Sequence, residues 1–397
     1  MHVRVNLTKA KPKGRRVLSV LPGVFMVALL ALGGLAALVS LATYDFPSET
    51  VLDGAWTAAY ENRFDEGLPF RPLATAAVSA IAYSFFGVGL EGVLIGQGGW
   101  LFTAEEFSYY PYEAAETAFK LALVKEVQAR LAAKGAALVV ALVPAKARVY
   151  EESLGRYRLP DYSRARYEAF RKGLNASGVV APDLFTPLLE AKAQGEVFLK
   201  TDTHWTPFGA AVAAGALAKA TSTVEGLELH REAFETVQEG VTRYLGDLLS
   251  FIPLGVLQDR LGPQPDTLPR LTTREISSSL GNALFGDMTI PVVLVGTSYS
   301  ASGVWNFRGA LQQSLGLSVL NAAQEGLGPI VPMLRYLDNP AFIETPPELV
   351  IWEIPERYLP VSYDLTSYGL TGCDKTDCDK IDCDRTGCGL TREGPGD

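Results

Sequence analysis

The sequence predicts an α/β fold in which a parallel sheet carries helices on both faces, preceded by one N-terminal transmembrane helix. Three observations support this prediction. A charge-free apolar run lies near the start of the chain, strand-like and helix-like segments alternate over residues 91–362, and several of the strand-like segments are apolar throughout. Alternating strands and helices are typical of a parallel sheet, whose strands are buried on both faces and therefore lack polar positions.

Residues 17–44 are the predicted transmembrane helix, because they run for 28 residues without a charge and a span needs about 20 apolar residues. The first 44 positions contain six basic residues and no acidic one. The positive-inside rule then places residues 1–16 in the cytoplasm and the chain after the helix on the other side of the membrane, outside the cytoplasm. A cleaved signal peptide is the alternative, but its apolar region is usually only about 7–15 residues long.

Residues 45–90 are predicted to form a juxtamembrane region and then a buried helix. The stretch 72–90 is apolar, and a second membrane span is its alternative interpretation. However, it is rich in Ala, Ser and Thr, and Arg63 and Arg71 would lie on its outer side, against the charge rule. We therefore expect a buried helix.

Residues 91–362 are the predicted folded domain. Two short strands around closely spaced glycines are expected at 91–102. Apolar runs predict further strands at 136–144, 178–184, 197–201, 291–298, 317–323 and 348–354. Helical spacing of apolar residues predicts helices at 112–134, 161–175, 186–194, 207–220, 303–316 and 328–338. The region 223–289 has Gly and Pro clusters and is expected to be less regular.

Residues 363–397 are predicted to be a disordered tail with little apolar content. The four cysteines of the chain lie in it, five residues apart: Cys373, Cys378, Cys383 and Cys388. Metal binding or disulfide formation is the alternative to a plain extension, but the spacing matches no zinc pattern.

The chain after residue 44 carries 29 basic and 44 acidic residues, a net charge of −15. This balance argues against a nucleic-acid-binding protein, which presents a basic surface. It also favours a neutral glycan over a polyanion, because long-range repulsion must be overcome locally. Lys146 and Arg148 follow the strand at 136–144 and are expected to form a local basic rim, whereas Glu356 and Arg357 are expected to form a structural ion pair.

One of only three histidines, His204, follows the predicted strand at 197–201 and lies two residues after Asp202. In strand-like geometry these two side chains share a face, so the carboxylate can orient the imidazole, as in a hydrolase triad. Ligands of open α/β sheets also bind at strand ends. A buried structural histidine and a metal site are the alternatives, although no other His or core Cys is placed to complete a metal site.

Ser298 is the candidate nucleophile. It is the last residue of the stretch 291–298, two residues after Gly296, on a turn that precedes a predicted helix. Glycine permits a sharp turn, and backbone N–H groups at the start of a helix can stabilise an oxyanion. A Gly-Thr-Ser string is weak evidence by itself, but together with a strand-end Asp-x-His it predicts a Ser-His-Asp triad.

These residues and several other segments resemble the periplasmic alginate O-acetyltransferases, a branch of the SGNH-hydrolase-like proteins. The matching segments recur in the expected order over roughly residues 50–360: QGGWLF (97–102), LVPAKARVY (142–150), TDTHWTPFGA (201–210), VLVGTSYS (293–300) and VIWEIPERYL (350–359). The resemblance implies a permuted SGNH-like sheet, because Asp-x-His precedes the serine. The Cys-rich tail has no counterpart in the family pattern.

The resemblance implies an O-acyltransferase that acetylates an exopolysaccharide, with Ser298 as nucleophile, His204 as general base and Asp202 as its orienting carboxylate. It implies a separate multispanning membrane O-acyltransferase as the source of the acetyl group, and no cofactor. Substrate contacts are expected from Tyr299 at the oxyanion site, from Trp205 stacking on a sugar and from Arg308 on an anionic glycan. Each of these three residues has an alternative interpretation without substrate contact: packing inside the protein for Tyr299 and Trp205, and a solvated helix face for Arg308.

Two rival functions remain open on the sequence. An extracytoplasmic carbohydrate acetyl-esterase would use the same triad with water as acceptor. Thr297 replaces the Asp of the Gly-Asp-Ser found in typical esterases, and this difference, with the anchor, favours transfer. An inactive glycan-binding or assembly protein is the other rival, which the presence of all three triad residues disfavours.

Overall fold

The computed structural model describes residues 14–43, 54–224, 231–276 and 290–363. The chain divides into two compact units. The first comprises Met1–Phe86 and Pro253–Gly262, and the second comprises Gly87–Ile252 and Pro263–Asp397. The second unit contains the sheet and the three expected catalytic residues.

The first unit is helical. Its helix α1 (Gly14–Ala42) overlaps the predicted transmembrane helix. Within α1, the 21 residues Pro22–Ala42 have a mean hydropathy of 2.5, and this is the one helix in the described part of the chain that is long and apolar enough to cross a membrane. The helices α2 (Ala55–Glu66), α3 (Arg71–Ile81) and α9 (Gln258–Leu261) belong to the same unit, and α3 continues into a π-helical turn at Ala82–Phe86.

The predicted burial of the helix at 72–90 is wrong. Ala76 and Ala80 are buried in α3, whereas Val78 and Phe85 are 67% and 81% exposed. Within its unit, α3 packs against the short turn Gly255–Leu257, which is too small to cover a whole helix. A helix that is apolar all round is expected to be buried, but the sequence does not show how much of its surface other residues of this chain cover.

Four parallel strands form the central sheet of the second unit, in the order β3-β8-β6-β7. Because parallel strands point the same way, their carboxyl ends share one edge of the sheet, where the loops after β6 and β8 meet. The strands are β3 (Ala137–Val143), β6 (Val292–Val295), β7 (Val319–Asn321) and β8 (Leu349–Pro355).

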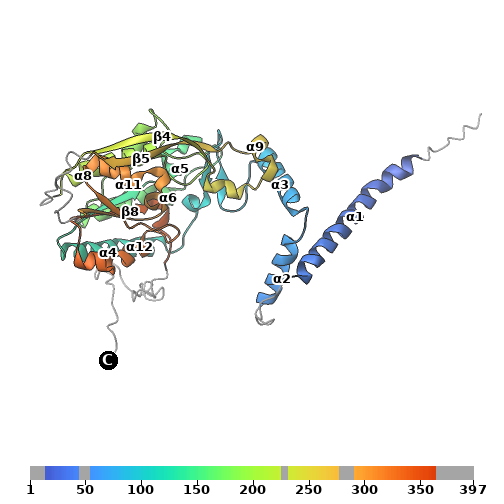
Figure 1. Ribbon diagram of the computed structural model, residues 1–397, viewed down its shortest axis with the longest axis horizontal. Coiled ribbons are helices and arrows are strands. Elements are labelled where there is room, and N and C mark those ends of the chain that lie inside the picture. Colours follow the sequence, from blue (N-terminus) through green and yellow to red (C-terminus); the bar gives the residue numbers. More distant parts are fainter. Residues whose placement is uncertain (1–13, 44–53, 225–230, 277–289, 364–397) are drawn as a thin grey trace, which may run out of the picture. The chain divides into compact units, whose positions relative to one another are not determined.

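Helices cover both faces of this sheet, as expected, because alternate side chains of each buried strand point to opposite faces. One face packs with α7, α8 and α11, and the other packs with α4, α6 and α12. Figure 1 shows α8 and α11 on one side of β8 and α4 and α12 on the other. These helices are α4 (Glu113–Ala132), α6 (Asp161–Ala176), α7 (Phe185–Ala191), α8 (Pro207–Thr221), α11 (Phe307–Leu315) and α12 (Ile330–Leu337). Three short helices are α5 (Lys146–Val149), α10 (Ser298–Ala301) and α13 (Pro340–Glu344).

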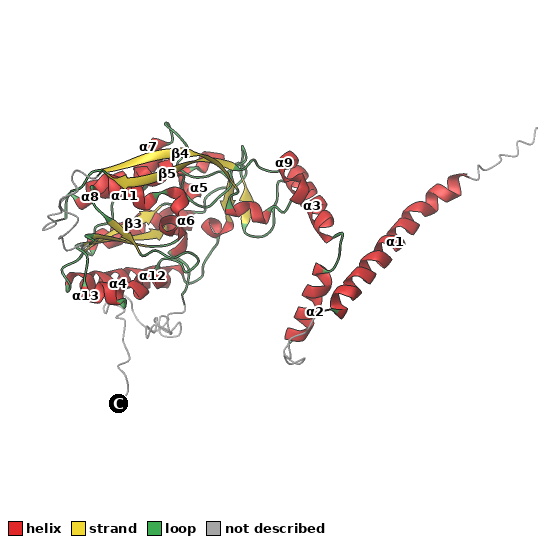
Figure 2. Cartoon of the chain, in the orientation of Figure 1, coloured by secondary structure: helices red, strands yellow, loops and turns green. Residues whose placement is uncertain are grey.

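Two antiparallel pairs complete the unit. β1 (Val93–Ile95) and β2 (Leu101–Thr103) form the hairpin expected near 91–102. β4 (Phe234–Tyr244) and β5 (Asp266–Glu275) are long paired strands that pack on α11 (Figure 2). The prediction of a less regular region at 223–289 is therefore wrong for these strands. Their residues are mostly polar and half exposed, so they lack the apolar alternation by which strands are recognised.

Two predicted strands are absent from the sheet. Residues 178–184 and 197–201 are irregular segments that contribute only the isolated bridges Val139–Val180 and Phe198–Trp205. Their apolar residues pack in the core without continuous strand pairing. An apolar run in the sequence indicates burial, but it does not distinguish a paired strand from an unpaired segment. Residues 364–397 with their four cysteines, and residues 1–13 and 44–53, lie outside the described residues.

Candidate active site

The turn that carries Ser298 follows the buried strand β6 at the carboxyl edge of the sheet. Thr297 caps the short helix α10 by accepting a hydrogen bond from the N–H of Tyr299 at 3.3 Å, and Ser298 is the first residue of that helix. Gly296 is required here by close approach, because a Cβ at this position would lie 2.4 Å from Oε2 of Glu353 on the neighbouring strand β8. The turn is therefore built for tight packing against that strand.

The side chain of Glu353 on β8 holds this turn in place through hydrogen bonds. Its carboxylate accepts the N–H of Thr297 at 2.7 Å, the hydroxyl of Thr297 at 3.0 Å and the hydroxyl of Ser300 at 3.0 Å. Burial raises the pKa of Glu353 to about 7, against the lowering effect of these hydrogen bonds. Sequence reasoning missed this residue, since a lone Glu in an apolar strand has no signature apart from its poor fit to the strand pattern.

Ser298, His204 and Asp202 lie in hydrogen-bond contact. Nε2 of His204 lies 2.7 Å from Oγ of Ser298, and Nδ1 of His204 lies 2.6 Å from Oδ1 of Asp202. Asp202 has no exposed surface and His204 is 8% exposed. Burial opposes ionisation of Asp202, but the hydrogen bonds from His204 and from the N–H of Asp247 outweigh it, so the pKa of Asp202 lies below its ordinary value.

The segment 200–204 is a turn rather than the expected strand end, so its backbone donors need acceptors outside the sheet. Asp266 of β5 accepts the N–H groups of Lys200 at 2.8 Å and of Thr201 at 2.9 Å. Asp247 accepts the N–H and the hydroxyl of Thr203 at 2.9 and 2.6 Å. Side-chain carboxylates from the β4–β5 region therefore fix the backbone on both sides of Asp202.

Lys146 holds the same segment through its carbonyls. Its buried Nζ donates to the carbonyl oxygens of Leu101, Lys200 and Asp202 at 2.6, 3.0 and 2.8 Å. Burial lowers the pKa of Lys146 to about 8, although nearby carboxylates favour its charge. The expectation of a basic rim is wrong for this lysine, because its ammonium lies inside the protein, where backbone carbonyls and the rings of Trp100 and Phe102 replace its water.

Two aromatic side chains pack on the imidazole. The Trp305 ring stacks on His204 with a centroid distance of 5.0 Å and an interplanar angle of 17°, and the Tyr299 ring lies at 4.6 Å. Tyr299 is 2% exposed and Trp205 is fully buried. Neither ring offers a free face, so the expected substrate contacts of Tyr299 and Trp205 are wrong in this structure. Both residues have the packing role instead, and Trp305 was not anticipated.

Glu356 and Arg357 form ion pairs with residues outside the triad, although the guanidinium of Arg357 lies 5.7 Å from the ring centroid of Tyr299. Arg308 is exposed on α11, as a solvated helix position would be. Glu356 pairs with Arg148 at 2.5 Å, and Arg357 lies 3.7 Å from Glu105. The expected ion pair between Glu356 and Arg357 is therefore wrong, because adjacent residues in this short 3₁₀ turn project toward different neighbours.

Asp202, His204 and Asp247 bring three ligand-type atoms within 4.8 Å of one another in the described part of the chain. Each of the three already has a protein partner: Asp202 and His204 bond to each other, and Asp247 bonds to Thr203. The hydrogen-bond pattern is that of a hydroxyl, a base and an orienting carboxylate in series, which suits nucleophilic acyl chemistry.

Residues 93–356 match a protein family described as SGNH hydrolase-like domain, acetyltransferase AlgX. The chain is 44% identical over 345 residues to the probable alginate O-acetylase AlgJ of Pseudomonas syringae pv. tomato, covering 86% of this chain and 88% of that protein. It is 41% identical over 346 residues to the probable AlgJ of Pseudomonas aeruginosa, covering 85% and 88%.

Two solved structures are similar to this chain. The O-acetyltransferase domain of Pseudomonas putida AlgJ superposes with a TM-score of 0.64 at 46% identity, covering 70% of this chain and 95% of that domain. Pseudomonas aeruginosa AlgX superposes with a TM-score of 0.56 at 25% identity, covering 75% and 68%. The observed sheet therefore matches the SGNH-like fold expected from the sequence.

Proposed function

Because the chain belongs to the SGNH hydrolase-like acetyltransferase family of AlgJ and AlgX, we propose that it transfers acetyl groups to hydroxyls of alginate through a covalent intermediate on Ser298. The observation that carries the proposal is the unbroken contact from Ser298 through His204 to Asp202, at 2.7 and 2.6 Å. Family membership establishes an O-acetyltransferase, and this contact supports the assignment of the three residues to the chemistry.

In the first half-reaction, Oγ of Ser298 attacks the carbonyl carbon of the acetyl donor. Nε2 of His204 accepts the hydroxyl proton as the new C–O bond forms, and Asp202 stabilises the resulting imidazolium through its bond to Nδ1. The tetrahedral intermediate then expels the donor's leaving group, which takes the proton back from His204. The product is an acetyl ester on Ser298.

In the second half-reaction, a sugar hydroxyl takes the place of the leaving group. His204 removes the proton of the sugar hydroxyl while the hydroxyl oxygen attacks the acetyl-serine carbonyl. Collapse of the tetrahedral intermediate then returns the proton to Oγ of Ser298. The stacked Trp305 ring keeps the imidazole in one orientation for both steps. The serine is thus regenerated and the acetyl group ends on the polysaccharide.

The proposal includes a place for the enzyme in the cell. With α1 as a single-pass anchor in the inner membrane, the second unit would act on the periplasmic side. A multispanning membrane O-acyltransferase would supply the acetyl group there, as the resemblance implies. Anchoring keeps the acceptor site close to a donor at the membrane, which raises the effective concentration of one for the other.

Acetylation of the protein itself tests the proposal. Full-length protein in detergent is incubated with 4-nitrophenyl acetate, and intact mass identifies an acetyl adduct. We expect the adduct in the wild type and in the control Ser314→Ala, which changes an exposed serine of α11, and its absence in Ser298→Ala. An adduct of equal yield in Ser298→Ala would refute the assignment.

The acceptor is tested by adding alginate oligosaccharides to the same reaction. The proposal predicts acetylated oligosaccharides, detected by their mass, in the wild type and not in Ser298→Ala. If the wild type releases all acetyl as free acetate at saturating oligosaccharide, the protein is an esterase and the transfer proposal fails.

A further inference from the structure

Helix α3 and the π-helical turn after it carry an exposed apolar face. No charged residue occurs from Pro72 to Leu90. Ala76 and Ala80 are the buried residues of α3. The side turned away from them exposes six apolar residues, spaced as on one face of a helix: Leu73, Ala74, Ala77, Val78, Ile81 and Phe85. A contiguous apolar surface of this kind marks a site of contact with a protein or a membrane.

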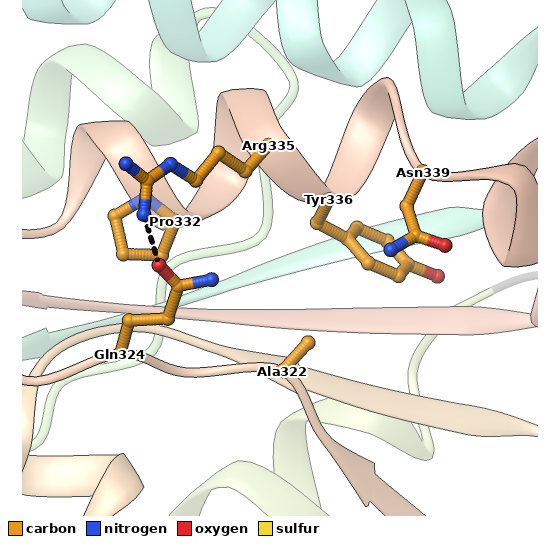
Figure 3. Close-up of a pocket in the computed structure, with 6 residues that line it drawn as sticks. All are labelled: Ala322, Gln324, Pro332, Arg335, Tyr336 and Asn339. Carbon is orange, nitrogen blue, oxygen red and sulfur yellow. Dashed lines mark hydrogen bonds between the residues drawn. The ribbon is translucent and has the colours of Figure 1, made fainter.

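The cavity of about 200 Å³ beside α12 offers no comparable surface. Pro332 and Tyr336 in its wall are buried, and Arg335 donates to Gln324 across it at 2.8 Å, as Figure 3 shows. The wall of the cavity is thus already packed and bonded within the protein, whereas the apolar face of α3 is exposed.

The chain just before α3 packs on the predicted transmembrane helix α1, within the same unit. The ring of Phe70 contacts α1 at Gly33, where a Cβ would overlap the ring. At Gly67, a Cβ would lie 2.9 Å from Cβ of Ser40. Between these contacts Ala37 is fully buried. One side of α1, over two turns, therefore holds the start of α3.

These contacts relate the start of α3 to the surface of the membrane. With α1 as the anchor proposed above, the apolar run follows Arg16, and about 20 residues cross the hydrocarbon core, so the core ends at about residue 36. That level lies within the part of α1 that contacts Phe70 and Gly67. The exposed ion pair between Arg71 and Asp65, at 3.0 Å, then lies among the lipid headgroups, where charge is tolerated. A bilayer is therefore the apolar phase that already lies beside α3.

We propose that α3 lies in the membrane interface on the side away from the cytoplasm, with its apolar face toward the acyl chains. The inference rests on the proposed anchoring by α1 and not on acetyl transfer. A helix of this kind sinks its apolar face about 5–10 Å into the boundary between headgroups and acyl chains. Since residues 72–90 contain no Lys or Arg, the contact comes from apolar surface and needs no anionic lipid.

This second membrane contact has a consequence for the catalytic unit. The second unit begins at Gly87, directly after the π-helical turn that ends at Phe86. A helix α3 held in the interface therefore fixes the first residue of the second unit at the membrane surface. With α1 alone, residues 43–86 would be a long tether.

Depth-dependent quenching in phosphatidylcholine liposomes tests the proposal on the full-length chain. The four cysteines of the tail are changed to serine, and one new cysteine is labelled with the fluorophore NBD. Ile81→Cys places the label on the apolar face, and Thr75→Cys places it about 120° around the same helix. Val27→Cys labels the middle of α1, and Ser314→Cys labels α11 of the second unit. All four positions are exposed, so thermal unfolding, followed by circular dichroism, should match that of the unlabelled chain.

The lipid carries a nitroxide quencher at carbon 5 or at carbon 12 of an acyl chain. We expect the label at Ile81→Cys to be quenched roughly twofold more by the shallow nitroxide than by the deep one, since an interfacial helix lies near the headgroups. The label at Val27→Cys should show the opposite order. The label at Thr75→Cys should be quenched less than that at Ile81→Cys, and the label at Ser314→Cys should not be quenched.

Two results would overturn the proposal while α1 is anchored. An unquenched label at Ile81→Cys, with Val27→Cys quenched, would leave the apolar face of α3 to a protein partner. Stronger quenching of Ile81→Cys by the deep nitroxide would mean that α3 spans the membrane. An unquenched label at Val27→Cys would refute the anchoring by α1 and this inference with it. Acetyl-enzyme formation in the same liposomes reports the proposed chemistry separately, so the failures are distinguishable.

Discussion

The buried carboxyl group of Glu353 is predicted to make the stability of this protein depend on pH. Its pKa rises from 4.5 to about 7 because it is buried, and each pKa unit corresponds to about 1.4 kcal/mol. A folded-state pKa above the unfolded value means that the folded protein binds the proton more tightly. The favourable contribution is therefore complete below pH ~4.5 and is lost as the pH rises through ~7.

Glu353→Gln removes this dependence, because the amide does not titrate. Its carbonyl oxygen still accepts the N–H of Thr297, so the serine turn can form. Between about pH 5 and about pH 8, the wild type should lose roughly 2.5 kcal/mol of unfolding free energy relative to the variant. Thermal unfolding followed by tryptophan fluorescence would show this loss as a relative Tm shift of roughly 5–10 °C.

The control is Glu344→Gln, which replaces an exposed carboxyl on α13 and should unfold with the same pH dependence as the wild type. A Tm difference between wild type and Glu353→Gln that is constant across the pH range would refute the reasoning. That result would mean that hydrogen bonds from Thr297 and Ser300 compensate fully for the burial of Glu353.

Two other substitutions probe the segment that holds the base. Asp202→Asn should lower the rate of acetyl transfer by about 10³–10⁴-fold, because an amide does not stabilise the imidazolium or hold its tautomer; a kcat near that of the wild type would contradict the triad. Lys146→Met removes a donor from three carbonyls, of which that of Lys200 keeps the N–H of Leu101 at 2.8 Å. At about 1–3 kcal/mol for each carbonyl left unpaired, the substitution should lower both stability and kcat. Lys120→Met, which replaces another buried lysine whose pKa is also lowered to about 8, should lower stability alone. Equal losses of kcat, measured where both variants are folded, would rule out the positioning role of Lys146.

The fold class was predictable because its signal is local and apolar. The runs at β3, β6 and β8 are buried on both faces, and this burial leaves a continuous apolar stretch in the sequence. The β4–β5 pair was missed for the opposite reason, since its polar residues face solvent along much of its length. An isolated apolar run such as 197–201 was overinterpreted, because burial alone does not require a strand partner.

The contact among Asp202, His204 and Ser298 was predictable, but for a partly wrong reason. The two-residue spacing was expected to act through strand alternation, whereas Asp202 reaches Nδ1 and the N–H of His204 within a turn. The supports of this turn are Lys146, Asp247 and Asp266, which lie 44 to 66 residues away from the groups that they hold. No local pattern marks them, since only the fold brings them to one place.

The net charge of −15 after residue 44 favoured a neutral glycan, yet the proposed acceptor is a polyanion. The disagreement is resolved by distance, because charges further than about 8–10 Å from an exposed ligand are largely screened at physiological ionic strength. The charges within that range of a bound sugar then decide whether it binds.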